Sequence, residues 1–384
     1  MDFPLGIWYN KFVGDIMRAK IINEEVYLPE PVGKQPKYWI CACDKRYLFK
    51  IGTVKQDGSP VYNDVSECMA ADIAELIGIP VAQYYLCEND GVKGVLSYDF
   101  LDNKLEGPKK EEFIDGVTLI NIIDPGFKNT SLVNPKTHQL YTADLVIQSV
   151  LKYNLIEDVI NMFVYDSLIG NRDRNPSNYG IIINHETDQI RFAPLYDNCT
   201  ALGVSMVDHR LHECVDENGN IIDEQQLDLV IHKHIVGKVT LDRFHQYKEK
   251  RAWDKIESKR IMDLIDEKKK ELLVLVEDGK LSVSEYHKIL NKIGDTYRKY
   301  DVSTLEYQQM ISYLTMFYSE YIEQIIDKIE KNITRENIDK LFDYYQDELP
   351  PDRLRFAKEL VLRRANWIVE YYKVNKYESR GKLL

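Results

Sequence analysis

The feature that most constrains this chain is a polar loop followed by a hairpin pattern. Asp173 and Asn178 stand five positions apart in a segment rich in Asn, Asp, Pro and Ser, residue types that favour turns. Two short apolar runs, residues 179–183 and 189–192, follow with a turn-like segment between them, and Asp197 comes soon after. A loop, a hairpin and a second loop would bring these three polar side chains to one end of a two-stranded ribbon.

Three oxygen-bearing side chains at one place suit a site for hard cations and a hydroxyl nucleophile, which is the constellation that phosphoryl transfer needs. The same residue types are also good turn formers, and Asp197 could cap a helix, so each residue taken singly has a structural alternative. The hairpin between the two acidic positions favours the site over that alternative.

The composition is that of an ordinary globular protein. The 384 residues are 44% hydrophobic and 29% charged, and no run approaches the roughly eighteen apolar residues of a membrane span. The six cysteines form no Cys-x-x-Cys pair and the N-terminus has no secretory signal, so we expect a cytoplasmic protein. The net charge of −12 argues against nucleic acid as a direct partner, because phosphate backbones are bound by clustered cations.

The chain changes character near residue 100. Upstream, short apolar runs separated by Gly, Pro, Asn and Asp predict strands, and one segment with apolar residues at the helical period predicts a helix. The strands are expected at residues 38–43, 47–51, 81–87 and 94–100, and the helix at residues 64–77.

Downstream of residue 140 helical patterns dominate. Long helices are expected at residues 156–169, 305–329 and 354–374, and a capping box of Ser303 and Glu306 opens the second of them. These patterns predict an α+β fold of two lobes, with a ligand cleft between them. The small β-rich lobe with one helix covers residues 1–100, and the large, mostly helical lobe covers residues 101–384.

The first lobe offers a candidate ion pair. Lys50 ends the predicted strand at residues 47–51, and Glu67 lies in the first turn of the predicted helix. If strand and helix pack together, Lys50 can pair with Glu67 while its ammonium group contacts the α- and β-phosphates of ATP. The structural alternatives are a strand-end lysine that reaches water and a capping arrangement of Asp64 with Glu67.

Two backbone segments of the first lobe complete the predicted nucleotide site. Gly33, Lys34 and Gln35 precede the first strand and could lie over the phosphates through backbone amides and the lysine charge, although no Walker motif occurs. Tyr98 and Phe100 flank Asp99 at the lobe boundary, where the backbone of a kinase would hydrogen-bond adenine.

Five elements of this chain, taken in order, resemble the HipA-like serine/threonine kinases, and in particular the compact, CtkA-like members, which lack an additional N-terminal subdomain. The likeness covers about residues 30–205, and beyond them only the helical character matches. The elements are Gly33-x-Gln35-Pro36-Lys37, Tyr47-Leu48-Phe49-Lys50, Glu67-x6-Ala74-x3-Gly78-Ile79-Pro80-Val81, Asn171-x-Asp173-x4-Asn178-x-Gly180 and Ala193-Pro194-x-Tyr196-Asp197.

The resemblance implies a two-lobed, protein-kinase-like fold and a role for each matched residue. Asp173 would orient or deprotonate the acceptor hydroxyl, and Lys50 would position ATP. Asn178 and Asp197 would hold Mg²⁺. At Asn175 HipA itself has histidine, so the phosphate contact expected at this position is lost or replaced. The loop near Gly33 has no hydroxyl side chain to autophosphorylate.

The predicted function is an ATP- and Mg²⁺-dependent protein serine/threonine kinase, with a protein substrate and with an antitoxin or other regulatory protein as a possible partner. Two alternatives stay open: a kinase-fold enzyme that acts on a lipid or small molecule, and a non-catalytic nucleotide-binding module. The acidic character of residues 198–230 speaks against a membrane-facing lipid kinase. The carboxylate of Asp173 speaks against a binding module, which has no need of it.

Overall fold

The computed structural model describes most of the chain between residues 36 and 381, together with short strands before residue 30. The described residues are 7–8, 11–12, 15–16, 19–21, 25–29, 36–42, 45–89, 91–102, 108–137, 139–233, 239, 270–276, 278–282, 285–286, 289 and 307–381.

A seven-stranded sheet forms the first lobe, in the order β1-β4-β8-β9-β7-β6-β5. Its pairs are antiparallel except for β4 with β8. All four predicted strands are confirmed, although the third begins three residues later than expected. The bounds are Ile7–Trp8 (β1), Ala19–Ile21 (β4), Glu25–Pro29 (β5), Lys37–Ala42 (β6), Lys45–Ile51 (β7), Tyr84–Asn89 (β8) and Val92–Tyr98 (β9), with Lys11–Phe12 (β2) and Asp15–Ile16 (β3) paired separately.

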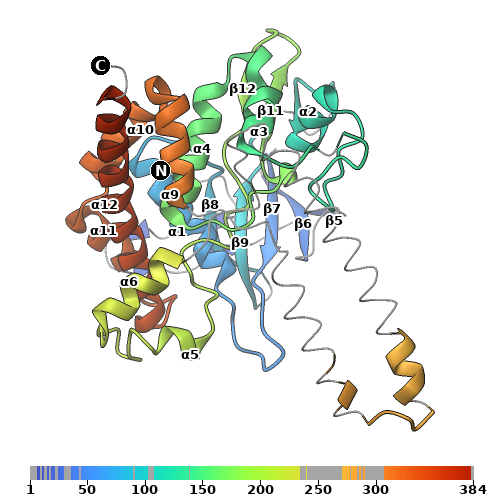
Figure 1. The fold of residues 1–384 in the computed structure, drawn as a ribbon, viewed down its shortest axis with the longest axis vertical. Coiled ribbons are helices and arrows are strands. Elements are labelled where there is room, and N and C mark those ends of the chain that lie inside the picture. Colours follow the sequence, from blue (N-terminus) through green and yellow to red (C-terminus); the bar gives the residue numbers. More distant parts are fainter. Residues whose placement is uncertain are drawn as a thin grey trace.

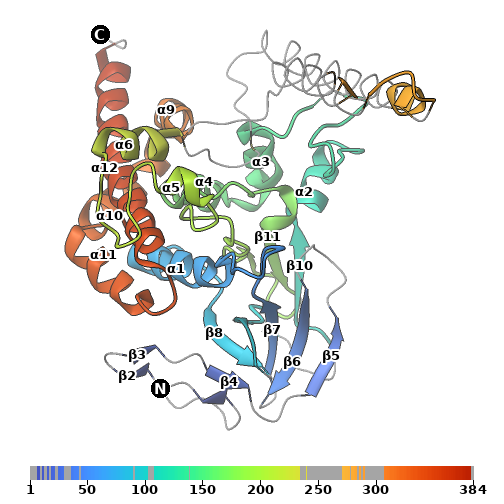
Figure 2. The same cartoon turned by 90° about the horizontal axis from the view of Figure 1, so that it is seen from below.

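Helix α1 (Asn63–Leu76) follows the expected apolar pattern. Val65, Met69 and Ile73 are fully buried, as a helical repeat of three to four residues requires. The helix ends where Gly78 adopts the left-handed region at φ 67°, which a glycine enters without strain. In Figure 2, α1 lies between the C-terminal helices and the strands of the large sheet.

The predicted hairpin is confirmed as β11 (Gly180–Asn184) and β12 (Ile190–Phe192), which pair antiparallel. A third strand that the sequence pattern did not reveal, β10 (Glu111–Asp115), pairs with the other edge of β11. This small sheet fixes the end of the polar loop that precedes β11 and the start of the acidic loop that follows β12.

The second lobe is mostly helical (Figure 1). Helix α4 (Ile156–Ile169) has the predicted bounds, and α12 (Pro351–Gly381) contains the predicted helix at residues 354–374. No helix of the described residues is long and apolar enough to cross a membrane. The remaining helices are Gly116–Ile123 (α2), Ala143–Val150 (α3), Asp208–Leu211 (α5), Glu224–Lys233 (α6), Tyr307–Phe317 (α9), Ser319–Asn332 (α10) and Arg335–Phe342 (α11).

The prediction of a single helix at residues 305–329 is wrong. The chain forms α9 and α10 instead, separated at Tyr318, whose φ of −139° and ψ of 38° are not helical. The break lets the apolar face of each helix pack independently: α9 lies against α12 and α4, and so does α10. The predicted capping box at Ser303 and Glu306 lies outside the described residues.

One continuous apolar core joins the two parts of the molecule. It contains the buried face of α1 together with residues of α4, α9, α10 and α12. A second, small core within the sheet is formed by Ile40, Tyr47, Phe49, Cys87 and Leu96. The predicted α+β class is confirmed, with a mostly antiparallel sheet beside a mostly helical lobe.

We predict that Gly94→Ala lowers the stability of the sheet next to Lys50. A Cβ atom at Gly94 would lie 2.3 Å from the carbonyl oxygen of Lys50 and 2.9 Å from the ring of Phe49, so strands β7 and β9 must separate. Overpacking of this kind costs about 1–3 kcal/mol in the free energy of unfolding, measured by denaturant titration. Val92→Ala, at an exposed position of the same strand, is the control and should change stability little.

Candidate active site

Lys50 and Glu67 form a buried ion pair between strand β7 and helix α1. Their Nζ and Oε1 atoms are 2.7 Å apart, and the residues are 5% and 1% exposed. Burial opposes the charge on Lys50, but Glu67, Tyr84 and Asp197 together raise its pKa well above the ordinary value. Lys50 therefore carries a permanent positive charge in the interior, and the expected pair is present.

The second carboxylate oxygen of Glu67 binds a partner other than Lys50. This Oε2 atom accepts a hydrogen bond from the backbone N–H of Asn198, at 2.9 Å. Burial raises the pKa of Glu67, while Lys50 opposes that rise. Helix α1 begins at Asn63, so Glu67 is its fifth residue and lies beyond the first turn in which it was expected, and its two oxygens bind Lys50 and Asn198 rather than the end of the helix.

Asp197 lies on the other side of Lys50. Its Oδ1 atom is 3.2 Å from Lys50 Nζ, and its backbone N–H donates to the Tyr84 hydroxyl at 3.2 Å. Burial alone would raise the pKa of Asp197, but Lys50 holds it below the ordinary value, so the carboxylate is ionised. Its backbone adopts the left-handed region at φ 58°, and among the described helices none begins here, so it is not a helix cap.

The loop before β11 holds Asp173 and Asn178 in a fixed relation. The backbone N–H of Asp173 donates to Asn171 Oδ1 at 3.1 Å, and its carbonyl accepts from Asn178 Nδ2 at 2.7 Å. The bond made by Nδ2 leaves Oδ1 as the atom with which Asn178 can bind a cation.

Asn175 has a structural task in this loop. Its side-chain oxygen accepts from the backbone N–H of Ser177 at 2.9 Å and caps the short 3-10 helix formed by Pro176–Asn178. Its amide nitrogen lies 3.4 Å from Asp173 Oδ1. The polar side chains of this loop thus stabilise its turn and also form part of the candidate site. A phosphate contact from Asn175 stays a prediction.

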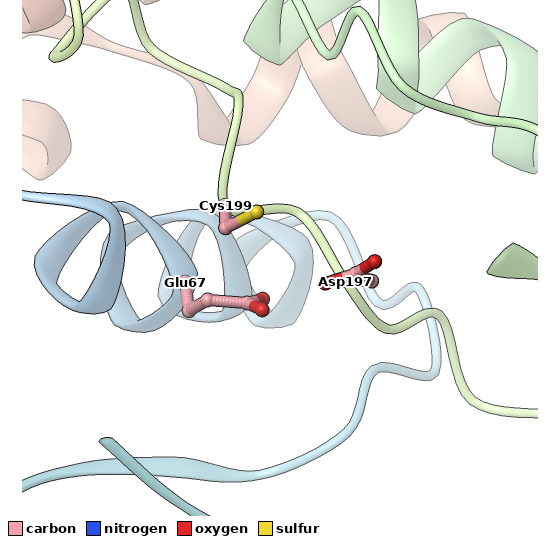
Figure 3. A group of neighbouring side chains, drawn as sticks. All are labelled: Glu67, Asp197 and Cys199. Atoms are coloured by element: carbon pink, nitrogen blue, oxygen red, sulfur yellow. The ribbon is translucent and has the colours of Figure 1, made fainter. Parts of the chain in front are cut away.

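The carboxylates converge near Cys199 (Figure 3). Burial raises the pKa of the Cys199 thiol, and the charges of Glu67, Asp197 and Asp173 raise it further. Ligand atoms of Glu67, Asp197 and Cys199 lie within 4.8 Å of one another. Mg²⁺ prefers oxygen ligands to sulfur, and Glu67 already binds Lys50, so we assign no separate Mg²⁺ site to this trio.

Asn178 and Asp197 remain the candidate ligands for Mg²⁺. An amide oxygen and an ionised carboxylate are the hard oxygen donors that this cation binds in phosphate-transfer sites, where it keeps several waters and phosphate ligands. Asp197 is 34% exposed at its side chain, so solvent and a bound ligand can reach it. The donor set therefore fits the cation.

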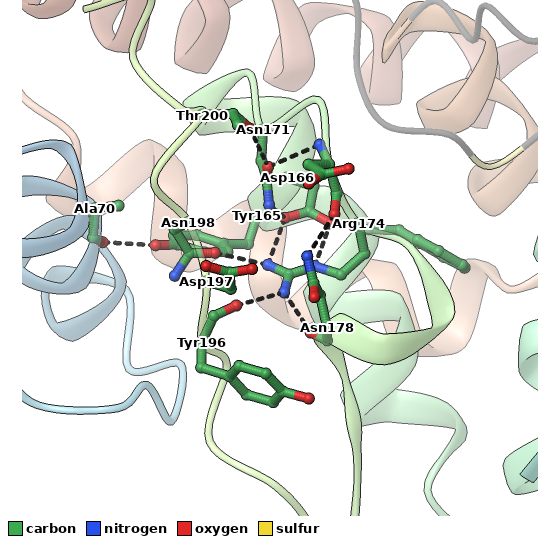
Figure 4. A network of polar contacts seen from close by, with 12 residues as sticks. Ala70, Tyr165, Asp166, Asn171, Arg174, Asn178, Tyr196, Asp197, Asn198 and Thr200 are labelled. Atoms are coloured by element: carbon green, nitrogen blue, oxygen red, sulfur yellow. Dashed lines mark hydrogen bonds and ion pairs between the residues drawn. The ribbon is translucent and has the colours of Figure 1, made fainter. Parts of the chain in front are cut away.

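A buried arginine that the motif reasoning passed over organises the whole region (Figure 4). Arg174 is 1% exposed and forms two hydrogen bonds of 2.9 Å with the Asp166 carboxylate on α4. It also donates to the carbonyls of Asn178 and Tyr196, at 2.6 and 2.9 Å, and to Asn198 Oδ1 at 2.7 Å. The sequence signal for this network was an aspartate, Asp166, within an apolar run in the last turns of the helix at residues 156–169.

The predicted adenine-binding residues lie at the C-terminal end of β9, where Tyr98 is the last residue of the strand and Phe100 follows it. The ring of Tyr98 packs against Tyr47 and Tyr85, with centroids 4.7 and 5.5 Å apart. Phe100 packs against Phe113 and Tyr196 at 5.6 and 5.7 Å. Their role in nucleotide binding stays a prediction.

The phosphate-covering segment at Gly33, Lys34 and Gln35 lies outside the described residues. Of the predicted site, the structure therefore brings Lys50, Glu67 and Asp197 into direct contact and holds Asp173 with Asn178 beside them.

We predict that Arg174→Met destabilises the protein strongly, because it leaves the Asp166 carboxylate buried without its cation. Removing one partner of a buried pair costs about 3–5 kcal/mol in the free energy of unfolding. Arg172→Met, two positions earlier and exposed, is the matched control and should change stability by less than about 0.5 kcal/mol. Equal effects of the two substitutions in denaturant titration would contradict a central role for Arg174.

Comparison with known proteins gives a structural likeness only. No family model matches the chain, and none of the curated proteins matches it. The proinflammatory kinase CtkA of Helicobacter pylori superposes with a TM-score of 0.59 at 15% identity, over 94% of this chain and 97% of that one. HipA of Shewanella oneidensis, solved with HipB and operator DNA, gives a TM-score of 0.46 at 11% identity, over 91% of this chain and 67% of that one.

The likeness to CtkA extends over nearly the full length of both chains. It confirms, at the level of the fold, the resemblance predicted from the sequence motifs. This chain has the two-lobed, kinase-like fold of CtkA.

Proposed function

We propose that this protein is an ATP- and Mg²⁺-dependent phosphotransferase of the HipA-like type that phosphorylates serine or threonine residues of a protein substrate. The observation that carries the proposal is the buried lysine between two carboxylates. Lys50 contacts Glu67 at 2.7 Å and Asp197 at 3.2 Å. A fixed cation beside a partly exposed carboxylate is what the phosphates of ATP and their metal require.

Each residue of the candidate active site then has a definite role in the reaction. Glu67 holds the Lys50 ammonium group in place, and Lys50 binds phosphate oxygens and offsets the charge that develops on them. Asp173 accepts or orients the proton of the attacking hydroxyl. Asn178 and Asp197 bind Mg²⁺, which when present neutralises the charge of the phosphates.

The buried network supplies the preorganisation that this chemistry needs. Arg174 connects the carbonyls of Asn178 and Tyr196, so it fixes the distance between the two predicted metal ligands. Groups held in place before the substrate arrives lose little free energy to reorganisation during the reaction. The choice of a protein acceptor rests on the sequence motifs.

We predict that Asp173→Ala and Asp197→Asn abolish phosphoryl transfer and leave the fold intact. The first removes the group that handles the acceptor proton; the second removes a metal-binding charge, and asparagine tolerates the left-handed backbone at this position. Transfer is measured with labelled ATP and Mg²⁺, with the protein alone and with cell lysate. Glu186→Ala, at an exposed turn position, is the control.

Label on a protein band that needs both aspartates supports the proposal. Label on lipid or on a small molecule would instead identify a kinase with a different acceptor. A variant of Asp173 or Asp197 with wild-type turnover would refute the assignment of the site.

We also predict that substitutions in the buried pair of Lys50 and Glu67 affect stability and activity independently. Lys50→Met should abolish transfer and destabilise the protein by about 3–5 kcal/mol, because the Glu67 carboxylate remains buried without its cation. Adding Glu67→Gln should restore most of the stability and none of the activity, since a neutral amide needs no cation. The free energy of unfolding and the transfer rate of the single and the double variant, compared with the wild type, test this. Recovery of activity in the double variant would exclude Lys50 as a phosphate-binding group.

A further inference from the structure

The hydroxyl group of Thr200 joins the loop after β12 to the polar loop that contains Asp173. Its Oγ1 atom donates to Asn171 Oδ1 at 3.0 Å and accepts from the backbone N–H of Arg172 at 3.3 Å. Figure 4 shows the bond to Asn171 beside the Arg174 network. Both partners of Thr200 lie within two positions of Asp173, although the proposed reaction gives Thr200 no role.

Asn171 lies between Thr200 and Asp173. It is fully buried, and its Oδ1 atom also accepts from the backbone N–H of Asp173, at 3.1 Å. Its amide nitrogen donates to Asp166 Oδ1 at 3.1 Å. A carboxamide oxygen has two lone pairs, and Asn171 uses one for Thr200 and the other for Asp173. The side chain of Asn171 is therefore held at both of its polar atoms.

Thr200 itself belongs to a turn that is bound to helix α1. The backbone N–H of Ala201 donates to the Asn198 carbonyl at 3.0 Å and closes this turn. At its start the N–H of Asn198 donates to Glu67 Oε2 at 2.9 Å, and at its end the Ala201 carbonyl accepts from the Ser66 hydroxyl at 3.1 Å. Thr200 therefore connects a turn fixed on α1 with the polar loop before β11.

The two bonds of Thr200 act on successive peptide groups of the polar loop. The N–H of Arg172 binds Thr200 directly, and the N–H of Asp173 binds the oxygen of Asn171 that Thr200 also holds. These peptide groups lead into the backbone that carries the Asp173 carboxylate. A group that handles the acceptor proton must lie within hydrogen-bond reach of the acceptor hydroxyl, and a small displacement lowers the rate strongly.

We propose that Thr200 is a positioning residue, whose hydroxyl group holds Asp173 in the orientation that the acceptor requires. The hydroxyl proton is donated to Asn171, so it is not offered to a phosphate group. Arg174 thus fixes the two predicted metal ligands, and Thr200 fixes the residue that handles the proton. The effect of Thr200 on the rate rests on the proposed function, whereas its hold on the loop does not.

Three variants separate the hydroxyl group from the shape of the side chain. Thr200→Val replaces the hydroxyl by a methyl group of similar size and removes both bonds. Thr200→Ser keeps the hydroxyl and should keep both bonds. Thr118→Val, at an exposed position of α2, is the matched control for the loss of a hydroxyl elsewhere. All three variants should fold, because none changes the volume of a side chain by more than one methyl group, and their melting temperatures verify this.

Hydrogen exchange of the Arg172 and Asp173 amides, followed by NMR, tests the hold on the loop. We expect Thr200→Val to raise both exchange rates about tenfold, because the first amide loses its acceptor and Asn171 loses a bond that orients it. Thr200→Ser and Thr118→Val should keep the wild-type rates. Unchanged exchange in Thr200→Val would overturn the proposal.

The transfer assay, with cell lysate as the acceptor and labelled ATP at varied concentration, tests the effect on the reaction. We expect Thr200→Val to lower kcat about tenfold and to leave KM for ATP unchanged, because a displaced Asp173 affects the transfer step and not the nucleotide. Thr200→Ser should restore the wild-type rate. A wild-type rate in Thr200→Val, or a rise in KM for ATP as large as the fall in kcat, would overturn the role in positioning.

The two measurements keep this proposal apart from the proposed function. Absence of transfer by the wild type would count against the proposed function. The exchange rates would still decide whether Thr200 holds the loop of Asp173.

Discussion

The ion pair of Arg174 with Asp166 is the constraint on which the rest of the site depends. A guanidinium group that is 1% exposed is tolerable only if every donor finds an acceptor, and here the acceptors come from three separate segments. They are the Asp166 carboxylate on α4, the carbonyls of Asn178 and Tyr196, and the Asn198 side chain. One buried charge therefore fixes the loop before β11, the loop after β12 and the helix behind both.

The left-handed backbone of Asp197 shows how that network sets reactive geometry. A non-glycine residue at φ 58° is strained by about 1–2 kcal/mol, and the neighbouring contacts offset that cost. Tyr84 accepts from the Asp197 N–H on one side, and Arg174 binds the Tyr196 carbonyl on the other. The Asp197 carboxylate is thereby aimed at Lys50 before any ligand binds, which is the preorganisation expected of an electrostatic catalyst.

Sequence patterns predicted local elements well and long-range contacts less well. The bounds of α4 and the hairpin at residues 180–192 follow from apolar period and turn chemistry, which act over a few residues. The pairing of Lys50 with Glu67 was expected because strand and helix are neighbours in the chain.

Other features depend on packing between distant segments. No glycine or proline marks the break at Tyr318 in the sequence. The break depends instead on packing, because α9 and α10 each lie against α4 and α12. The partners of Arg174 lie 4 to 24 positions away and include main-chain carbonyls, which carry no signal in the sequence. Tertiary context decides such contacts.

The shared core of α1 has a consequence for how the cleft opens. This helix packs into the same apolar cluster as α4, α10 and α12, and Tyr165 of α4 donates to the Ala70 carbonyl at 2.6 Å. The central strands have their own small cluster. Leu86 and Val95 of the sheet belong to the cluster of α1 as well, so this helix is packed against both parts of the molecule. Because Lys50 belongs to β7 and Glu67 to α1, any change in the separation of strand and helix would alter the 2.7 Å contact between the two side chains.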